Sequence, residues 1–486
     1  MNKIGELVGR PLTKEHLNSE IFLQLSNSDF KYISNESKEL LENYSTATDT
    51  KIGKELWINL LIDSISILKI NDKREKLYDD SSKSEDFAAD FSKIRKSSTY
   101  GINEIASYFD EFIKFESVLY GTDEHYRDHV DHVLQVWGIG IGLLLKNKFK
   151  LADNCCLSDT NFHFEIPEAN KKESIDGKNN ETQNVSKSEY YAMWTIIALC
   201  HDLGYPIEKT SQINKQAKKI ISHFGNMNFS ELNYSFDIFN TFLVDKFLNV
   251  ISSKAVFSEE LNYTMIQTKY RDKFSKSLED YKHGIFSSLL LYKNLTYFLE
   301  TDFFVSKSSL DPEDLRQFLI RKEILRSISS HTCPKIYHID LNTLSFLLIL
   351  CDELQEWNRP KFSELSFSKL TSKEPTVQIK QFDMDDDNQK IWLCFKYDLL
   401  LTINEKKYLI NDRFKNIHCL LRSAKGDSNR NTFFKWEIED KDGKFTFCFD
   451  SMQNSFKQLR VYYQKLNGKR FDIEIDYELY KDYYEK

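Results

Sequence analysis

The sequence is poor in the residues that interrupt helices. Its 486 residues include only 15 glycines and 7 prolines, beside 36 phenylalanines and 25 tyrosines. Glycine and proline are the strongest local breakers of regular structure. Their scarcity therefore predicts long helices and argues against a loop-rich fold.

Hydrophobic segments long enough to cross a membrane are also missing. No apolar run approaches the roughly 18 residues that indicate a spanning helix. The opening stretch, MNKIGELVGRPLTKEHLNSE, lacks the apolar core of a signal peptide. We therefore expect a cytoplasmic protein that has no membrane partner.

Cysteine occurs without the spacing of a zinc site. None of the eight cysteines forms a CxxC pair, and Cys155 and Cys156 are adjacent. Cysteine-based zinc sites use such pairs. We expect reduced thiols that are buried as small hydrophobic side chains.

Positive charge is not in excess, because the formal net charge is −8. Broad binding to a phosphate backbone needs a basic surface, so we expect no extended nucleic-acid surface. The phosphate-binding motifs GxxxxGKS/T and GxGxxG are absent as well. A small basic pocket for one nucleotide remains compatible with this composition.

The sequence changes character twice along its length. Residues 1–100 are polar with helical patterns, and residues 101–368 carry apolar runs at helical spacing. Residues 369–486 contain alternating, aromatic-rich stretches such as TVQIKQF and KFTFCFD, which are typical of strands. The expected fold class is mainly α: an N-terminal helical extension, a helical core and a smaller C-terminal β-rich (α+β) domain. Within the core, residues 153–189 are rich in Asn, Ser and Lys and are predicted to be a flexible insertion.

Histidine and aspartate recur at the ends of apolar runs in the predicted core helices. The motif HDLGYP follows IIALC, and DELQEW follows LLILC. An ionised carboxylate removed from water is costly unless it is paired or bound to a metal, so these positions need partners. The candidate metal ligands are His132, His201, Asp202, His283, His331 and Asp352.

The order of these motifs, a histidine, then His-Asp, then an aspartate on successive helices, resembles the HD-domain superfamily of metal-dependent phosphohydrolases. The resemblance covers roughly residues 125–360 and is carried by HVLQVWGIG, HDLGYP and DELQEWNRP. It implies a helical catalytic core whose first metal ligands are His132, His201, Asp202 and Asp352. It also implies that His283 and His331 hold a second ion, with Asp202 bridging the two.

The resemblance further implies the chemistry. Imidazole and carboxylate ligands without thiolate favour Mn, Fe, Co, Ni or Mg over a tetrahedral zinc site. Such ions lower the pKa of bound water and neutralise phosphate oxygens. The reaction implied is hydrolysis of a phosphate ester or anhydride by metal-activated water.

Candidate substrate contacts surround these ligands in the sequence. His129 lies one helical turn before His132 on the same face, where it can contact substrate. The candidates for binding phosphate are Lys209, His223, Lys335 and Arg359.

Two classes of function stay open. The first is a nucleotide hydrolase, with a (deoxy)nucleoside triphosphate as the first candidate substrate and a cyclic or oligonucleotide phosphodiester as the alternative. Helical triphosphohydrolases usually carry an arginine three residues before the first histidine and a lysine after the final aspartate, where this chain has His129 and Glu353. The second class is a nucleotide-sensing scaffold that needs no metal. The C-terminal region has no chemical motif, and three roles stay open for it: binding a protein partner, completing a homo-oligomer or closing over the active site.

Overall fold

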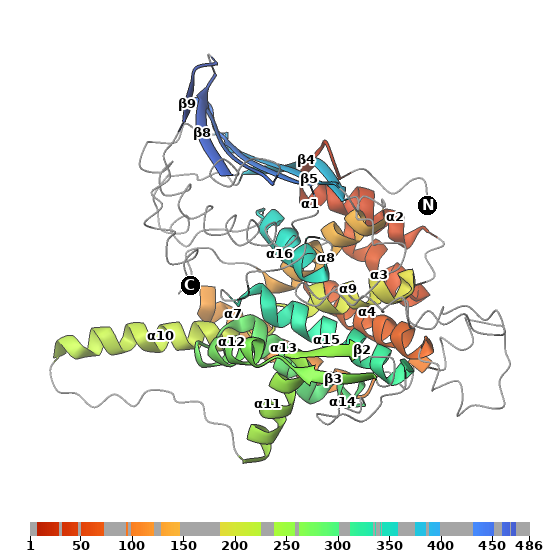
Figure 1. Ribbon diagram of the computed structural model, residues 1–486. Coiled ribbons are helices and arrows are strands. Elements are labelled where there is room, and N and C mark those ends of the chain that lie inside the picture. Colours follow the sequence, from red (N-terminus) through yellow and green to blue (C-terminus); the bar gives the residue numbers. More distant parts are fainter. Residues whose placement is uncertain are drawn as a thin grey trace.

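The structure is a computed structural model, shown in Figure 1. It describes residues 7–28, 32–46, 50–71, 94–95, 99–120, 128–145, 185–224, 238–257, 262–300, 312–333, 336, 341, 343–357, 375–384, 388–398, 431–451, 459–466 and 468–472. Of the insertion predicted at residues 153–189, only residues 185–189 are among them. None of the described helices is long and apolar enough to cross a membrane.

Helices make up most of the described chain, and strands gather in the C-terminal region, as the sequence predicts. The N-terminal helices are α1 (Lys14–Leu17), η1 (Asn18–Phe22), α2 (Leu23–Ser26), α3 (Asn35–Thr46) and α4 (Thr50–Ile70). The central helices are α7 (Ile102–Tyr120), α8 (His129–Leu145), α9 (Lys187–Cys200), α10 (Tyr205–Ile221), η4 (Ser222–Phe224), α11 (Ile238–Ile251), α12 (Thr268–Glu279), α13 (His283–Asn294), α14 (Thr296–Leu299), α15 (Pro312–His331) and α16 (Leu344–Leu354).

The strands form one large sheet and one hairpin. The seven-stranded sheet has the order β1-β4-β5-β6-β7-β8-β9, built from β1 (Pro11–Leu12), β4 (Thr376–Met384), β5 (Asn388–Lys396), β6 (Asn431–Glu439), β7 (Gly443–Asp450), β8 (Leu459–Lys465) and β9 (Arg470–Asp472). Of the strand pairs that the structure describes in this sheet, only β5 with β6 is parallel. The hairpin joins β2 (Ser253–Phe257) and β3 (Asn262–Ile266) inside the region expected to be purely helical. In Figure 1 the sheet stands at one end of the helical body, beside α1 and α2.

Hydrogen bonds from three tryptophans join α9, the helix that ends at the His-Asp motif, to α4 and α8. The indole N–H of Trp57 in α4 donates to the carbonyl of Leu199 in α9, at 2.8 Å. Trp137 of α8 donates to Thr195 of α9, at 2.9 Å. Trp194 returns a bond to the carbonyl of Trp137, at 3.1 Å. Because all three rings are buried, these bonds fix the rotation of α9 against α4 and α8.

The start of α9 is fixed by a capping box and a buried ion pair. The Ser186 side chain accepts from the backbone of Glu189, whose carboxylate accepts from the backbone of Ser186. The same carboxylate binds Arg316 of α15, with both side chains nearly buried. Removing one member of such a pair would leave a buried charge unpaired, so it ties α15 to α9.

Successive side chains of the sheet point to opposite faces, and the two faces differ in their surroundings. In β6, Phe434, Trp436 and Ile438 point into an apolar core that is continuous with the helical body. Glu437 lies on the other face and is fully buried. The N-terminal strand β1 pairs with β4, so residues expected to be purely helical contribute an edge strand to the C-terminal sheet.

Three lysines surround the Glu437 carboxylate. Lys435, Lys444 and Lys380 place their Nζ atoms 2.9, 3.2 and 3.3 Å from it, and the indole N–H of Trp392 donates to it at 3.0 Å. Burial alone raises the pKa of Glu437. The hydrogen bonds from Lys435 and Trp392 and the lysine charges outweigh burial and lower the pKa from 4.5 to about 2.

A pH-dependent loss of stability follows from this lowered pKa. The ionised Glu437 carboxylate stabilises the folded state fully above pH 4.5, and this contribution is lost as the pH falls toward 2. The reason is that the Glu437 carboxyl binds its proton more weakly in the folded chain than in the unfolded chain. We expect Glu437→Gln to lower the free energy of unfolding at neutral pH by about 2 kcal/mol, allowing for screening around the partly exposed lysines. Urea unfolding at a series of pH values should show this loss of stability shrink below pH 4.5.

The control is Glu439→Gln, which removes a more exposed ion pair with Lys396 and should change the free energy of unfolding by less than about 1 kcal/mol. An equal loss of stability in both variants would contradict the stabilising role of Glu437.

Candidate metal centre

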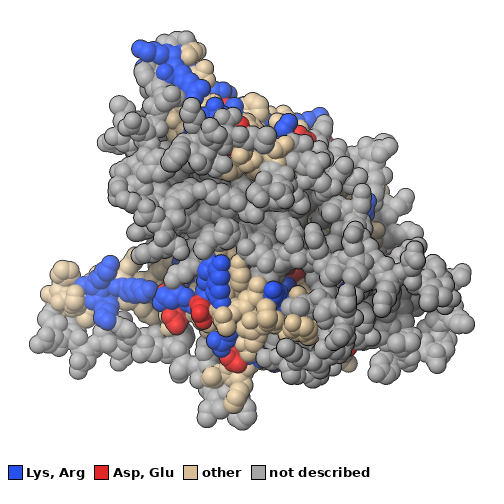
Figure 2. All heavy atoms as spheres, in the orientation of Figure 1, with Lys and Arg blue, Asp and Glu red and all other residues tan. Residues whose placement is uncertain are grey.

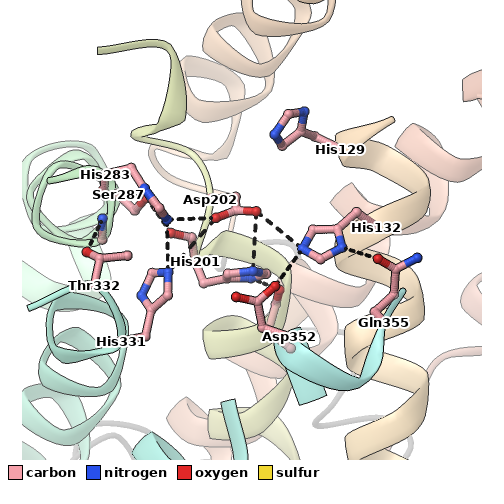
Figure 3. A network of polar contacts seen from close by, with 12 residues as sticks. His129, His132, His201, Asp202, His283, Ser287, His331, Thr332, Asp352 and Gln355 are labelled. Atoms are coloured by element: carbon pink, nitrogen blue, oxygen red, sulfur yellow. Dashed lines mark hydrogen bonds and ion pairs between the residues drawn. The ribbon is translucent and has the colours of Figure 1, made fainter. Parts of the chain in front are cut away.

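Six side chains meet at one point because five helices end there (Figure 3). They are His132 in the first turn of α8, His201 and Asp202 directly after α9, His283 at the start of α13, His331 at the end of α15 and Asp352 in the last turn of α16. These are the six metal ligands that the sequence predicts, and all six come together.

Asp202 lies at the middle of the cluster and has a different pair of histidines on each side. Its Oδ2 is 3.3 Å from Nε2 of His132 and 3.4 Å from Nε2 of His201. Its Oδ1 is 3.2 Å from Nε2 of His283 and 3.9 Å from Nε2 of His331. The carboxylate therefore separates two half-sites, each supplied with two imidazole nitrogens.

Asp352 completes the half-site of His132 and His201. Its Oδ1 lies 3.2 Å from Nε2 of His132. One ligand atom from each of these three residues lies within 4.8 Å of the others, and the same holds for His201, Asp202 and His331. Both groups are compact enough to hold a metal ion.

All four histidines point Nε2 inward because Nδ1 is engaged outside the cluster. Each Nδ1 lies at hydrogen-bond distance from an acceptor. The acceptors are Gln355 Oε1 for His132 (2.8 Å), the Ala198 carbonyl for His201 (2.8 Å), Glu208 Oε2 for His283 (2.7 Å) and the Ile328 carbonyl for His331 (2.6 Å). A neutral imidazole held in this way carries its proton on Nδ1 and directs the Nε2 lone pair at the centre.

The Gln355 amide is itself held in one orientation. Its Nε2 donates to Gln135 Oε1 and to the carbonyl of Trp357, both at 2.8 Å. Because both amide protons are used, Oε1 must face His132 and accept from Nδ1. This buried relay keeps His132 in the tautomer that a metal ligand requires.

The charge balance of the cluster favours a cation. Burial lowers the pKa of His201 to about 4, so its ring is neutral, and its Nε2 is buried without a hydrogen-bond partner. Burial acts to raise the pKa of Asp202, but the surrounding histidines lower it well below its usual value. An ionised carboxylate and an unsatisfied imidazole nitrogen in a buried cluster fit a bound metal ion.

His283 differs from the other three ligand histidines because it lies between two carboxylates. Burial alone lowers its pKa, but hydrogen bonds to Asp202 and Glu208 raise it to about 9. Burial alone raises the pKa of Glu208. Its hydrogen bonds with His283 and the charges of His283 and Lys282 outweigh burial and lower this pKa to about 2. His283 therefore holds a proton when no other cation is bound, and a metal ion would replace that proton.

Two glycines let the helices approach closely enough to form the cluster. A Cβ on Gly204 would lie 2.2 Å from the carbonyl of His283, and a Cβ on Gly284 would lie 2.8 Å from the ring of His331. The buried Ser287 hydroxyl of α13 also bonds to the His-Asp turn. It accepts from the Gly204 backbone N–H at 2.7 Å and donates to the carbonyl of His201 at 2.6 Å. These contacts hold α13 against both the His-Asp turn and α15.

Of the substrate contacts that the sequence predicts, His129 and Lys209 lie together beside the centre. Nδ1 of His129 is 2.6 Å from the buried Glu116 carboxylate, and its ring lies 4.6 Å from the ring of Tyr205. The Nζ of Lys209 lies 5.0 Å from the centre of the same tyrosine ring. Tyr205 also contacts the ring of His283, so it lies between His129 and the second half-site.

Of the other predicted substrate contacts, only His223 is among the described residues, and it is not brought to the centre. His223 is exposed in η4, at the far end of α10 from Asp202. A rigid helix of this length spans about 25 Å, which explains why a position only twenty-one residues after Asp202 is remote from it. Lys335 and Arg359 lie outside the described residues.

Sequence reasoning missed the residues that orient the ligands. Gln355 follows Asp352 by three residues, a spacing that puts both on one side of a helix end and is a usable signal. Glu208 carries no such signal, because acidic residues are common in the first turn of a helix. Ser287 carries none either, because small residues are common in apolar helices. Their contacts with His283 and with the His201 carbonyl depend on the packing of α10 and α13.

The chain was compared with protein-family models, with curated proteins and with solved structures, and nothing in any of the three matches it. The geometry of the cluster therefore carries the functional argument by itself.

Loss of the Gln355 relay should weaken metal binding without unfolding the chain. Gln355→Leu keeps the volume of the side chain but removes the acceptor that fixes His132. Orienting partners of this kind are worth about 10–100-fold in metal affinity, and we expect a loss in that range. Titration with Mn²⁺ or Co²⁺ measures it, with the exposed Gln212→Leu as the control. Equal affinity in both variants would show that the relay does not orient a ligand.

Proposed function

We propose that the chain is a metal-dependent phosphohydrolase of the HD-domain kind, with two divalent ions held on either side of Asp202. The observation that carries this proposal is the buried carboxylate with two imidazole nitrogens directed at each of its oxygens. A purely structural cluster would need none of these inward-facing lone pairs. The resemblance of the motifs HDLGYP and DELQEWNRP to that superfamily adds independent support.

The two half-sites offer different ligands. The first combines His132, His201 and Asp352 with one oxygen of Asp202, and the second combines His283 and His331 with the other oxygen. Divalent ions bound there would supply activated water and neutralise phosphate charge. Nitrogen and carboxylate donors suit Mn, Fe, Co, Ni or Mg.

Among the six ligand side chains, those of Asp352 and His283 are the most exposed. The Asp352 side chain is 23% exposed and that of His283 is 18% exposed, while the other four ligands are at most 7% exposed. A substrate would therefore approach between these two residues. Tyr205 borders the His283 side, where its ring can pack against a substrate, and Lys209 offers a positive charge to a phosphate there.

A nucleotide is the proposed substrate, with a (deoxy)nucleoside triphosphate as the first candidate. The second candidate is a phosphodiester in a cyclic nucleotide or oligonucleotide. The two-sided arrangement around Asp202 favours this second candidate, because a pair of ions can stabilise both the attacking and the leaving oxygen of a displacement. A metal-supplemented screen of both substrate classes, with product identification, distinguishes them.

Replacing Asp202 with alanine tests the proposal directly. Asp202→Ala removes the carboxylate shared by both half-sites, while the four histidines can rest neutral in a folded chain. We expect hydrolysis to fall to background and bound metal to decrease, with an unchanged circular-dichroism spectrum. The exposed Asp398→Ala is the matched control. Wild-type turnover by Asp202→Ala would sink the proposal, and a wild-type chain that binds nucleotide but holds no metal would favour the scaffold alternative.

The two half-sites should lose metal separately. His283→Ala or His331→Ala removes a ligand from the second half-site only, so each variant should keep about one tightly bound ion and lose most activity. His132→Ala should lose the first ion as well. His223→Ala, at the far end of α10, should keep the full metal content and rate. Metal analysis of the four purified variants measures this. Full metal content and rate in both His283→Ala and His331→Ala would rule out a dinuclear centre.

A further inference from the structure

Helix α10 begins beside Asp202 and then leaves the body of the protein. Its first turn contacts α13 through Glu208, which binds His283. Its distal half and η4 are largely exposed, and Figure 1 shows this part extending away from the other helices. We call residues 212–224 the α10 arm.

The α10 arm has a continuous apolar side. Ile213, Ala217, Ile220 and Phe224 follow one another at intervals of four, three and four residues, which places them on one face of a helix. Ile220 is 62% exposed and Phe224 is 74% exposed. Large apolar side chains exposed together on one face indicate a contact surface.

The rest of the α10 arm is basic. Lys215, Lys218 and Lys219 are exposed and lie away from the centre of the apolar side. The arm contains no acidic residue, although the chain as a whole has a net charge of −8. Figure 2 shows lysine side chains along α10, with uncharged residues at its tip. The arm is therefore a local positive region that is also amphipathic.

An anionic lipid surface fits both properties of the arm at once. A nucleic acid would neutralise the lysines but leave Ile220 and Phe224 in water. An uncharged protein groove would cover the apolar side and leave the lysines without a role. At a lipid surface, the apolar side enters the boundary of the acyl chains while the lysines reach the phosphates of the headgroups.

We infer that the α10 arm docks the protein on membranes that contain anionic lipid. Such docking is peripheral and requires no spanning helix, and it departs from the sequence-based expectation that no membrane partner exists. Because α10 is about 25 Å long, the His-Asp cluster at its base would lie within that distance of the headgroups. The inference does not depend on the proposed hydrolase activity.

Vesicle flotation tests the inference with the purified full chain. The vesicles are phosphatidylcholine alone and phosphatidylcholine mixed with phosphatidylserine. We expect binding only to the mixed vesicles, weakening as salt is raised. Lys215→Glu/Lys218→Glu/Lys219→Glu should bind at least about a hundred-fold more weakly, since each lysine near an anionic surface contributes about five-fold. Ile220→Glu/Phe224→Glu should lose binding altogether, because both side chains are exposed in the free protein and charge would keep them out of the membrane.

The control is Leu466→Glu, which alters a side chain that is 76% exposed at the end of β8 and should bind like the wild type. Circular dichroism and bound metal, measured on all variants, verify that they are folded. Two results would overturn the inference. One is equal recovery of wild type and Ile220→Glu/Phe224→Glu with the mixed vesicles, including no binding by either. The other is a dimer in light scattering that Ile220→Glu/Phe224→Glu converts to a monomer, because the arm would then join two copies of the chain.

Discussion

The buried carboxylate of Asp202 is the constraint on which the rest of the structure depends. It lies among four imidazole rings whose Nε2 atoms all face it, two at each oxygen. Such a group is costly to bury unless positive charge compensates it. Contacts with Asp202 and Glu208 raise the pKa of His283 to about 9, so a proton there would supply one such charge, and divalent ions on both sides would supply more. The buried histidines and aspartates of the cluster could therefore hold metal ions.

The surrounding fold keeps this arrangement rigid. The tryptophan bonds between α4, α8 and α9 fix the helix that ends at the His-Asp turn. Close packing at Gly204 and Gly284 brings α13 to that turn and to α15. The acceptors at each Nδ1 then fix the direction of every ring. Precise placement of ligands by a packed shell is what a metal site requires.

The sequence predicts which six side chains come together because each one adjoins an apolar run whose burial can be read from its pattern. Asp352 after LLILC and Asp202 after IIALCH are examples. The mainly helical fold and the C-terminal strands can be predicted for the same reason, since periodicity is a local property. The pairing of β1 with β4 and the contact of Glu208 with His283 join residues far apart in the chain, and no local pattern encodes them. The sequence offers His223 as a candidate phosphate contact, but α10 places it far from Asp202.

Anomalous diffraction from crystals grown with Mn²⁺ tests the central claim most directly. Two peaks are expected, one beside each oxygen of Asp202 and about 3.5–4 Å apart, as in other two-metal sites. The peak near His283 and His331 should vanish in crystals of His283→Ala, while the peak near His132 and Asp352 stays. Well-ordered crystals that bind Mn²⁺ elsewhere, with no peak within bonding distance of Asp202, would contradict the account.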